Sequence, residues 1–173
     1  MLIRQETPAD YPAVYSLVQR AFASAPVKDG TEQDLVVALR KSRHFIPQLS
    51  LVAEDSGKIL GHIMFTTLQI GTHEALTLAP LSVAPGHQRQ GVGQALIREG
   101  HRIAKALGYE VVILLGNEKY YPKWGYQPAS TFGIRAPFPV ADENFMAIHL
   151  DGKKVKWDAV VKFPSAFGIE NRE

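Results

Sequence analysis

The spacing of hydrophobic residues changes several times along the chain, and each spacing predicts a different element. Residues 2–5 are expected to form a short first strand. A helix is then expected to begin with Thr7 as its N-cap residue and Pro8 at its first helical position. Apolar residues recur at helical spacing as far as Phe22, and a second helix is expected over residues 31–41.

A run of strands follows these two helices. Residues 49–54 and 59–70 are expected to form a hairpin around the polar turn 55–58. Residues 76–83 form the next predicted strand, which contains Pro80. Because proline cannot donate to a strand ladder, we expect a bulge or a local gap in pairing at this point.

The second half of the chain mixes the two periodicities. The strongest helix is predicted over residues 91–107, and the continuous apolar run 111–115 favours a strand buried on both faces. A short helix is expected over residues 119–123, and late strands over 146–150 and 156–161. These elements predict an α/β fold whose first half is mainly antiparallel, with at least one crossover helix.

Composition narrows the class of protein. The chain has 173 residues, a net charge of +2 and no cysteine, which indicates one domain over residues 1–173 without disulfides or thiolate ligands. No basic stripe points to nucleic acid, and no apolar run is long enough to span a bilayer. The N-terminal residues lack the apolar core of a signal peptide, so we expect a cytoplasmic protein.

The most specific segment is residues 81–96, which reads as a strand, a turn and a helix that opens with Gly91 and Gly93. A helix start offers unpaired N–H groups, and glycines let a phosphate approach the backbone, with Arg89 as a nearby cation. The two glycines could equally serve only to pack the helix against a sheet. A dinucleotide-binding loop would need a small residue where Leu96 stands, and no Gly-Lys-Ser/Thr phosphate loop is present.

This segment resembles the signature loop of the GNAT-type N-acetyltransferases, Gln/Arg-x-x-Gly-x-Gly/Ala, with Gln88, Gly91 and Gly93 at the defining positions. Within that superfamily, the chain is most similar to the YhbS-like bacterial branch of predicted acetyltransferases. The stretches that carry the closer similarity are 51–54, 61–63, 78–83, 115–117, 120–126 and 137–140.

The resemblance implies a mixed, mostly antiparallel central sheet with a V-shaped splay, flanked by helices, and acetyl-CoA as cosubstrate. It implies that a strand segment pairs with the pantetheine arm, that the loop amides hold the pyrophosphate, and that two further residues contact the cofactor arm. In that order, the cofactor-binding residues are Leu81, Ser82 and Val83; Gln88, Arg89, Gln90, Gly91, Val92, Gly93 and Gln94; and Asn117 and Tyr120.

Two tyrosines stand near the end of the predicted buried strand. A phenol near the sulfur can protonate the departing thiolate when an amine attacks a thioester. The resemblance selects Tyr121 as this acid, because the family's tyrosine lies four positions before a pair that is here Gly125-Tyr126. The alternative is that these aromatic side chains only pack beneath a helix.

A general base is harder to assign, because residues 76–83 contain no acid. Glu32 is the candidate, although a glutamate at a helix start is also favoured by the helix dipole. His62 lies in a strand pattern that fits a packed or an exposed side chain. Asp142 and Glu143 either border the substrate pocket or are solvated loop acids. The histidines show no metal-ligand spacing, so no metal site is predicted.

The expected function is therefore acetyl transfer from acetyl-CoA to a primary amine by direct attack in a ternary complex. The alternative is a non-catalytic acyl-CoA binding or sensing module on the same fold. The expected partner is a small-molecule or peptide amine, not nucleic acid or membrane, and the strand 156–161 is compatible with pairing in a homodimer. Phe132, Phe138 and Phe145 either shape the acceptor site or cover the core.

Overall fold

The computed structural model describes residues 1–23 and 30–169, and its fold confirms the predicted mixed α/β class with a mostly antiparallel sheet. Contacts divide the chain into two compact units. The first contains residues 1–66 and 79–103, and the second contains residues 67–78 and everything from Ala104 onward. Strands β3 and β4 and helix α3 each contribute residues to both units.

Four strands form the sheet of the first unit. They are β1 (Leu2–Gln5), β2 (Phe45–Asp55) and parts of β3 (Lys58–Ile70) and β4 (His73–Val83), neighbours in that order. The pairs β1–β2 and β2–β3 are antiparallel. The predicted hairpin is thereby confirmed, although β2 begins four residues earlier than its apolar core at Leu49.

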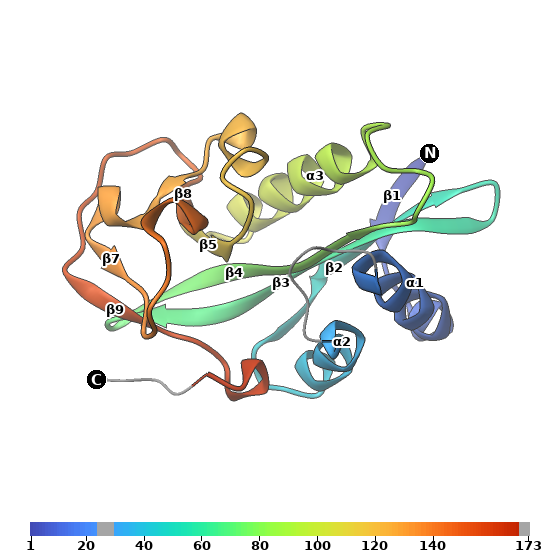
Figure 1. The fold of residues 1–173 in the computed structure, drawn as a ribbon, viewed down its shortest axis with the longest axis horizontal. Helices are drawn as coiled ribbons and strands as arrows, with labels where there is room; N and C mark the ends of the chain where they lie inside the picture. Colours follow the sequence, from blue (N-terminus) through green and yellow to red (C-terminus); the bar gives the residue numbers. More distant parts are fainter. Residues whose placement is uncertain (24–29, 170–173) are drawn as a thin grey trace. The chain divides into compact units, whose positions relative to one another are not determined.

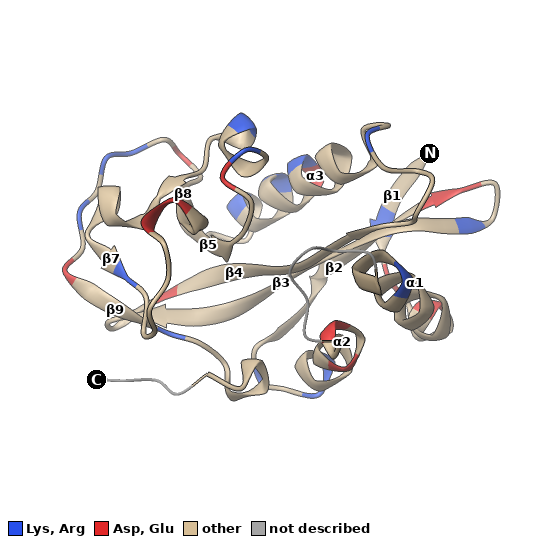
Figure 2. Ribbon diagram, viewed as in Figure 1, with Lys and Arg blue, Asp and Glu red and all other residues tan. Residues whose placement is uncertain are grey.

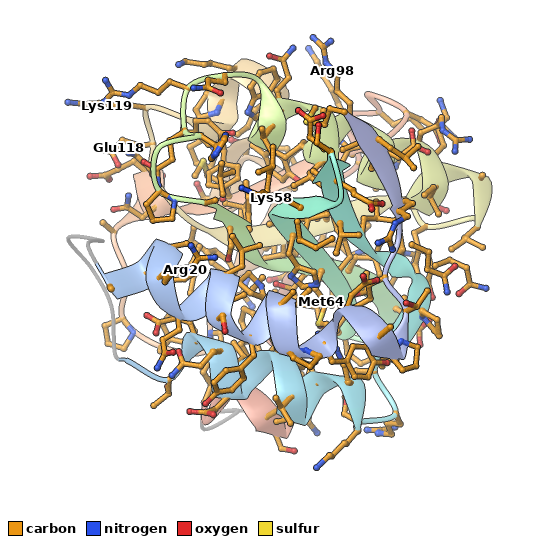
Figure 3. The ribbon with its side chains drawn as sticks, turned by 90° about the vertical axis from the view of Figure 1, so that its right-hand side faces the viewer. Arg20, Lys58, Met64, Arg98, Glu118 and Lys119 are labelled. Atoms are coloured by element: carbon orange, nitrogen blue, oxygen red, sulfur yellow. The ribbon has the colours of Figure 1, made fainter. Side chains whose placement is uncertain are left out.

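Two helices of the first unit lie side by side, as Figures 1 and 3 show. Helix α1 (Tyr11–Ala23) follows a short 3-10 turn, Pro8–Asp10, in which the Asp10 carboxylate accepts a 2.7 Å hydrogen bond from the Thr7 N–H. Helix α2 (Glu32–Arg40) begins with acidic residues and ends with a basic one, which complements the helix dipole. Both helices were predicted within a residue or two of these bounds, apart from the 3-10 start.

Helix α3 (Val92–Ala106) packs against β3 through two glycines. A Cβ on Gly61 would stand 2.8 Å from Val92 Cγ1, and a Cβ on Gly100 would stand 2.3 Å from the ring of Phe65. Successive strand residues point to opposite faces, so α3 covers the face of Gly61 and Phe65 and leaves His62 on the other. The two glycines therefore allow the helix to approach the strand closely.

The second unit is built around β5 (Val111–Leu115), which is buried except for its last residue, as predicted. It pairs parallel with β4 at Leu76–Val112 and Thr77–Ile113, and antiparallel with β8 (Phe145–His149). The remaining short elements, several of which the sequence pattern did not predict, are β6 (Gln127–Pro128), β7 (Ile134–Arg135), β9 (Ala159–Lys162) and the 3-10 turns Tyr121–Trp124, Ala129–Phe132, Asp142–Asn144 and Ser165–Phe167.

The predicted strand 156–161 is wrong at its start, because β9 begins only at Ala159. The Trp157 N–H donates at 2.6 Å to the carbonyl of Phe132, the last residue of the 3-10 turn Ala129–Phe132, so this stretch lies outside a strand ladder. Strand β9 pairs antiparallel with β3 at Gln69–Lys162 and parallel with β7. Both of its sides are used within the second unit, which does not favour the predicted pairing in a homodimer.

The three phenylalanines left open by the sequence pattern pack into the second unit. Phe132 and Phe145 are buried in its core, and Phe138 is packed against that core with its ring 6.0 Å from that of Phe163. They therefore act as core residues. No helix in the described residues is both long and apolar enough to cross a bilayer.

Candidate functional site

The loop between β4 and α3 lies in the first unit and carries one basic residue, Arg89, and no acid (Figure 2). The carbonyl of Gly91 accepts the first helical hydrogen bond, from the Ala95 N–H at 3.0 Å. The N–H groups of the following first turn consequently have no partner within the helix. Gly91 has a φ of 87°, and nothing lies within 4 Å of where its Cβ would be.

That geometry fits a diphosphate. Unpaired amides and the positive end of the helix dipole attract an anion, and the open side of Gly91 admits it to the backbone. Arg89 also adopts a positive φ, of 63°, so two of the last three residues before the helix, Arg89 and Gly91, have left-handed conformations. Val92 is buried behind the loop, which fixes the start of α3 on the sheet.

The strand that leads into this loop alternates between buried and half-buried side chains. Ser82 is only 2% exposed, and its hydroxyl has no hydrogen-bond partner within the described parts of the chain. Leu81 and Val83 are half-buried. The assignment of these three residues to the pantetheine arm stays a prediction.

In the second unit, the segment after β5 holds the two tyrosines in a fixed arrangement. Gly116 follows the strand directly, and a Cβ there would stand 2.4 Å from Cε2 of Tyr121, so the phenol ring lies against the glycine backbone. The ring of Tyr121 meets those of Tyr120 and Tyr126 edge to face, at 5.0 Å and 5.8 Å between centroids. Tyr126 is buried beneath this cluster.

Asn117 organises the turn between the glycine and the tyrosines. Its side-chain oxygen accepts from the Lys119 N–H at 2.8 Å, and its backbone carbonyl accepts from the Tyr120 N–H at 3.0 Å. Asn144, which the sequence did not single out, ties this turn to the start of β8. Its carbonyl accepts from the Gly116 N–H at 2.9 Å, and its amide nitrogen donates to the Gly116 carbonyl at 3.1 Å.

The environment keeps the tyrosine phenols protonated. Burial raises the pKa of Tyr121 far above the ordinary value of 10, and the neighbouring Tyr120 raises it further. Burial also raises the pKa of Tyr120. The phenol of Tyr121 therefore retains its proton across the physiological range, as a proton donor requires.

The similarity of the chain to known proteins decides the family. Residues 44–128 match the family described as the Acetyltransferase (GNAT) domain. The uncharacterized N-acetyltransferase YhbS of Escherichia coli K12 is 30% identical over 153 residues, which cover 87% of each chain. This chain belongs to the GNAT acetyltransferase family.

Other acetyltransferases are similar to this chain over part or nearly all of its length. The uncharacterized N-acetyltransferase YjhQ of E. coli K12 is 39% identical over 118 residues, 65% of each protein, so the match spans just under two thirds of that relative. A Brucella melitensis GNAT acetyltransferase in complex with acetyl-CoA has a TM-score of 0.80 and 30% identity, covering 96% of this chain and 97% of its own. The E. coli YhbS structure with CoA has a TM-score of 0.87 and 27% identity, covering 97% and 92%.

The candidate bases of this GNAT protein differ in their accessibility. Glu32 is the first residue of α2 and is half-buried, so it stays a candidate. Asp142 and Glu143 are exposed in the turn before β8. His62 is fully buried and is held in a polar cluster, which makes it a packed residue.

That polar cluster is formed by Glu6, Arg40, Ser50 and His62. It connects the residue that follows β1 with α2, β2 and β3. Both guanidinium bonds of Arg40 to the Glu6 carboxylate measure 2.9 Å. Ser50 Oγ donates to Glu6 at 2.5 Å and lies 3.1 Å from His62 Nε2, so the imidazole donates to the hydroxyl. Burial alone would raise the pKa of Glu6, but the bond from Arg40 and the other polar contacts outweigh it, and the pKa lies below its ordinary value.

No group of three or more histidine, cysteine, aspartate or glutamate side chains within residues 1–23 and 30–169 is arranged to hold a metal ion.

Proposed function

We propose that this protein transfers the acetyl group of acetyl-CoA to a primary amine by direct attack of the amine on the thioester. The observation that carries the proposal is the combination of two features in one chain. The phenol of Tyr121 is protonated and lies against Gly116, and the first turn of α3, directly after Gly91, has N–H groups without a partner in the helix. The first feature supplies a proton donor, and the second supplies an anion site. The proposed reaction uses both features.

The loop from Gln88 to Gln94 holds the diphosphate in this proposal. The first-turn N–H groups donate to its oxygens, and Arg89 adds a charge-assisted bond. The end of β4, from Leu81 to Val83, pairs with the pantetheine amides as an added strand would. Asn117 and Tyr120 contact the same arm. The relatives crystallised with acetyl-CoA and with CoA support this assignment of the ligand.

In this reaction Tyr121 has one role, which is to donate a proton to the leaving thiolate. The amine nitrogen forms a bond to the thioester carbonyl carbon, and the carbon–sulfur bond breaks. The departing thiolate takes the proton of the phenol. The proton lost by the amine passes to a base or to water, and the phenolate is then reprotonated by that base or by water. Glu32 is the candidate for that base, and the acceptor is a small-molecule or peptide amine.

The test separates catalysis from acyl-CoA binding alone. Free thiol release from acetyl-CoA is measured against a panel of primary amines, together with the affinity for CoA by calorimetry. We expect amine-dependent release by the wild type and a loss of about a hundredfold or more in kcat for Tyr121→Phe, with CoA affinity changed less than threefold.

Tyr109→Phe is the matched control, because Tyr109 is another partly buried tyrosine of the second unit that has no role in the proposal. Its kcat should equal that of the wild type. CoA binding without thiol release for every amine would favour the non-catalytic module. Full turnover by Tyr121→Phe would remove the assigned acid.

A further inference from the structure

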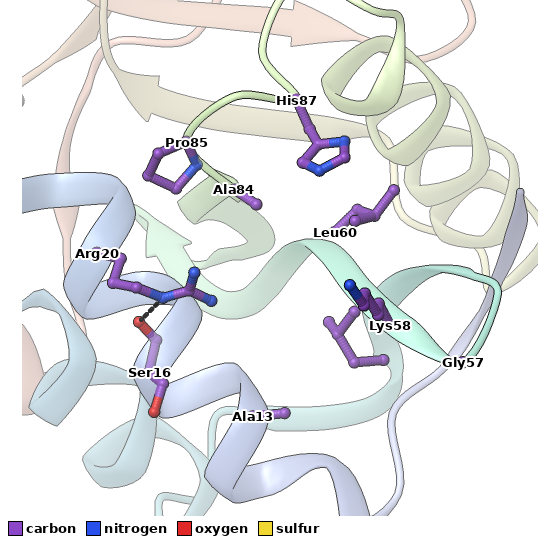
Figure 4. A pocket seen from close by; sticks show the side chains of 10 residues that line it. Ala13, Ser16, Arg20, Gly57, Lys58, Leu60, Ala84, Pro85 and His87 are labelled. Atoms are coloured by element: carbon purple, nitrogen blue, oxygen red, sulfur yellow. Dashed lines mark hydrogen bonds between the residues drawn. The ribbon is translucent and has the colours of Figure 1, made fainter.

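A hollow of about 420 Å³ lies within the first unit, and its volume falls in the range of small-molecule sites (Figure 4). We call it the α1 hollow. It is bordered by Ser16 and Arg20 of α1, by Lys58 and Leu60 of β3, and by Ala84 and His87 of the loop after β4. Leu60 and Ala84 are buried, and the Ala84 N–H donates to the Leu60 carbonyl at 2.8 Å, which fixes the inner wall.

The α1 hollow gathers positive and donor groups from three separate elements. Arg20, Lys58 and His87 border it, and its lining residues include no aspartate or glutamate. Figure 4 shows the Arg20 guanidinium and the His87 imidazole extending into the space from opposite sides. Within the described parts of the chain, neither Arg20 nor Lys58 forms an ion pair with a carboxylate.

Arg20 is oriented before any ligand arrives. Its Nε donates to the Ser16 carbonyl one turn earlier in α1, at 3.3 Å. This bond leaves the two terminal nitrogens of the guanidinium directed into the hollow (Figure 4). A planar fork with both ends available matches two oxygens of a phosphate, and Lys58 adds a point charge.

We propose that the α1 hollow binds the phosphate group of an organic phosphate. Two cations and an imidazole donor suit a dianion better than a carboxylate, whose single charge one of them would neutralise. Two residues that line the hollow, Ala84 and His87, come directly before the loop from Gln88 to Gln94 in the sequence. The proposed phosphate site therefore adjoins the predicted diphosphate loop along the chain.

The phosphate has two potential sources. It is either the 3′-phosphate on the ribose of coenzyme A, which rests on the proposed function, or a separate phosphate that binds independently of it. Both sources share the same chemistry at the site. The double variant Arg20→Gln/Lys58→Gln tests them, and Lys41→Gln/Arg43→Gln removes the same charge from exposed side chains of the first unit that do not border the hollow.

Calorimetry with CoA and with 3′-dephospho-CoA is the first arm. If CoA supplies the phosphate, Arg20→Gln/Lys58→Gln weakens CoA binding tenfold or more and dephospho-CoA binding less than twofold. The second arm titrates inorganic phosphate at constant ionic strength and follows the His87 ring by NMR, with the other histidines as references. If the phosphate is separate, the His87 signals shift saturably in the wild type and in Lys41→Gln/Arg43→Gln, but not in Arg20→Gln/Lys58→Gln.

The inference is overturned if the two double variants behave alike in both arms. A failure of the proposed function is distinguishable, because it would leave the wild type without CoA binding or thiol release while the phosphate titration of His87 can still succeed.

Discussion

Because residue 116 is a glycine, the phenol ring of Tyr121 can lie directly against the backbone at that position. Gly116 has a φ that other residues tolerate, so its importance comes from space and not from backbone strain. The ring occupies the volume that a Cβ would need, at 2.4 Å from Cε2. The proton donor proposed here needs a defined position, and the missing side chain of Gly116 leaves room for the ring at that position.

We therefore expect Gly116→Ala to displace the Tyr121 ring and to lower kcat at least tenfold, while CoA affinity changes less than threefold. Thiol release and calorimetry measure the two effects. Combining Gly116→Ala with Tyr121→Phe should cost little beyond Tyr121→Phe alone, because both changes act on the same group. Additive losses would show that the glycine matters for another reason.

A second prediction at the residue scale concerns acid stability. Burial lowers the pKa of His62 to about 4 from an ordinary 6.5, and the Glu6 charge only partly opposes this effect. The unfolded chain therefore binds a proton between these two pH values that the folded protein does not. The free energy of unfolding should fall as the pH drops from 6.5 to 4, by about 3 kcal/mol from this group.

Urea unfolding at a series of pH values measures this loss. In His62→Gln, whose amide can still donate to Ser50, the dependence between pH 6.5 and 4 should become shallower. His101, whose pKa burial also lowers to about 4, and Glu6, whose pKa lies below its ordinary value, contribute to the remaining slope. The wild type provides the reference, and equal slopes in the two proteins would contradict the assignment.

At the scale of elements, the sequence pattern predicted those helices and strands whose bounds depend on neighbouring residues. The bounds of β1, α2 and α3 follow from hydrophobic spacing and capping residues within the same stretch of chain. Strand β9 did not follow its alternating pattern, because the Trp157 amide is bonded to Phe132, 25 positions earlier. The two-residue strands β6 and β7 carry too little sequence to show any period.

The close approach of α3 to β3 leads to a prediction about packing. A methyl group at position 100 would meet the ring of Phe65 at 2.3 Å and 2.6 Å. We expect Gly100→Ala to destabilise the protein by about 1–3 kcal/mol, although alanine is the better helix former, because the ring must move within a full core. Urea unfolding measures the loss. Adding Phe65→Leu should recover part of it, and a gain in stability for Gly100→Ala alone would contradict the argument.

At the scale of the whole molecule, the boundary between the two compact units falls inside elements. It crosses β3 after Thr66, β4 after Leu78 and α3 after Ile103. Independent domains are normally separated by exposed linkers. We therefore keep the prediction of one domain and expect a single unfolding transition, with far-UV circular dichroism and tryptophan fluorescence coinciding along a urea titration. Two separated midpoints would show that the units unfold independently.

The contacts that the sequence could not reveal join residues far apart in the chain. The loop before α3 was visible because its glycines and Gln88 are close neighbours. The bonds of Asn144 to Gly116 span 28 positions, and no pattern marks them in advance. The cluster around His62 likewise draws single polar residues from four elements, each of which looks unremarkable in its own segment.

The position of Trp124 gives this protein a built-in optical reporter. Its indole stands edge-on to Tyr120 at 6.0 Å, in the same 3-10 turn as Tyr121. The chain has only two tryptophans, and the other, Trp157, lies in the stretch that leads to β9. In a Trp157→Phe background, emission would come from the turn that carries the phenol alone, so stopped-flow quenching could time each arrival and departure of a ligand there without a label.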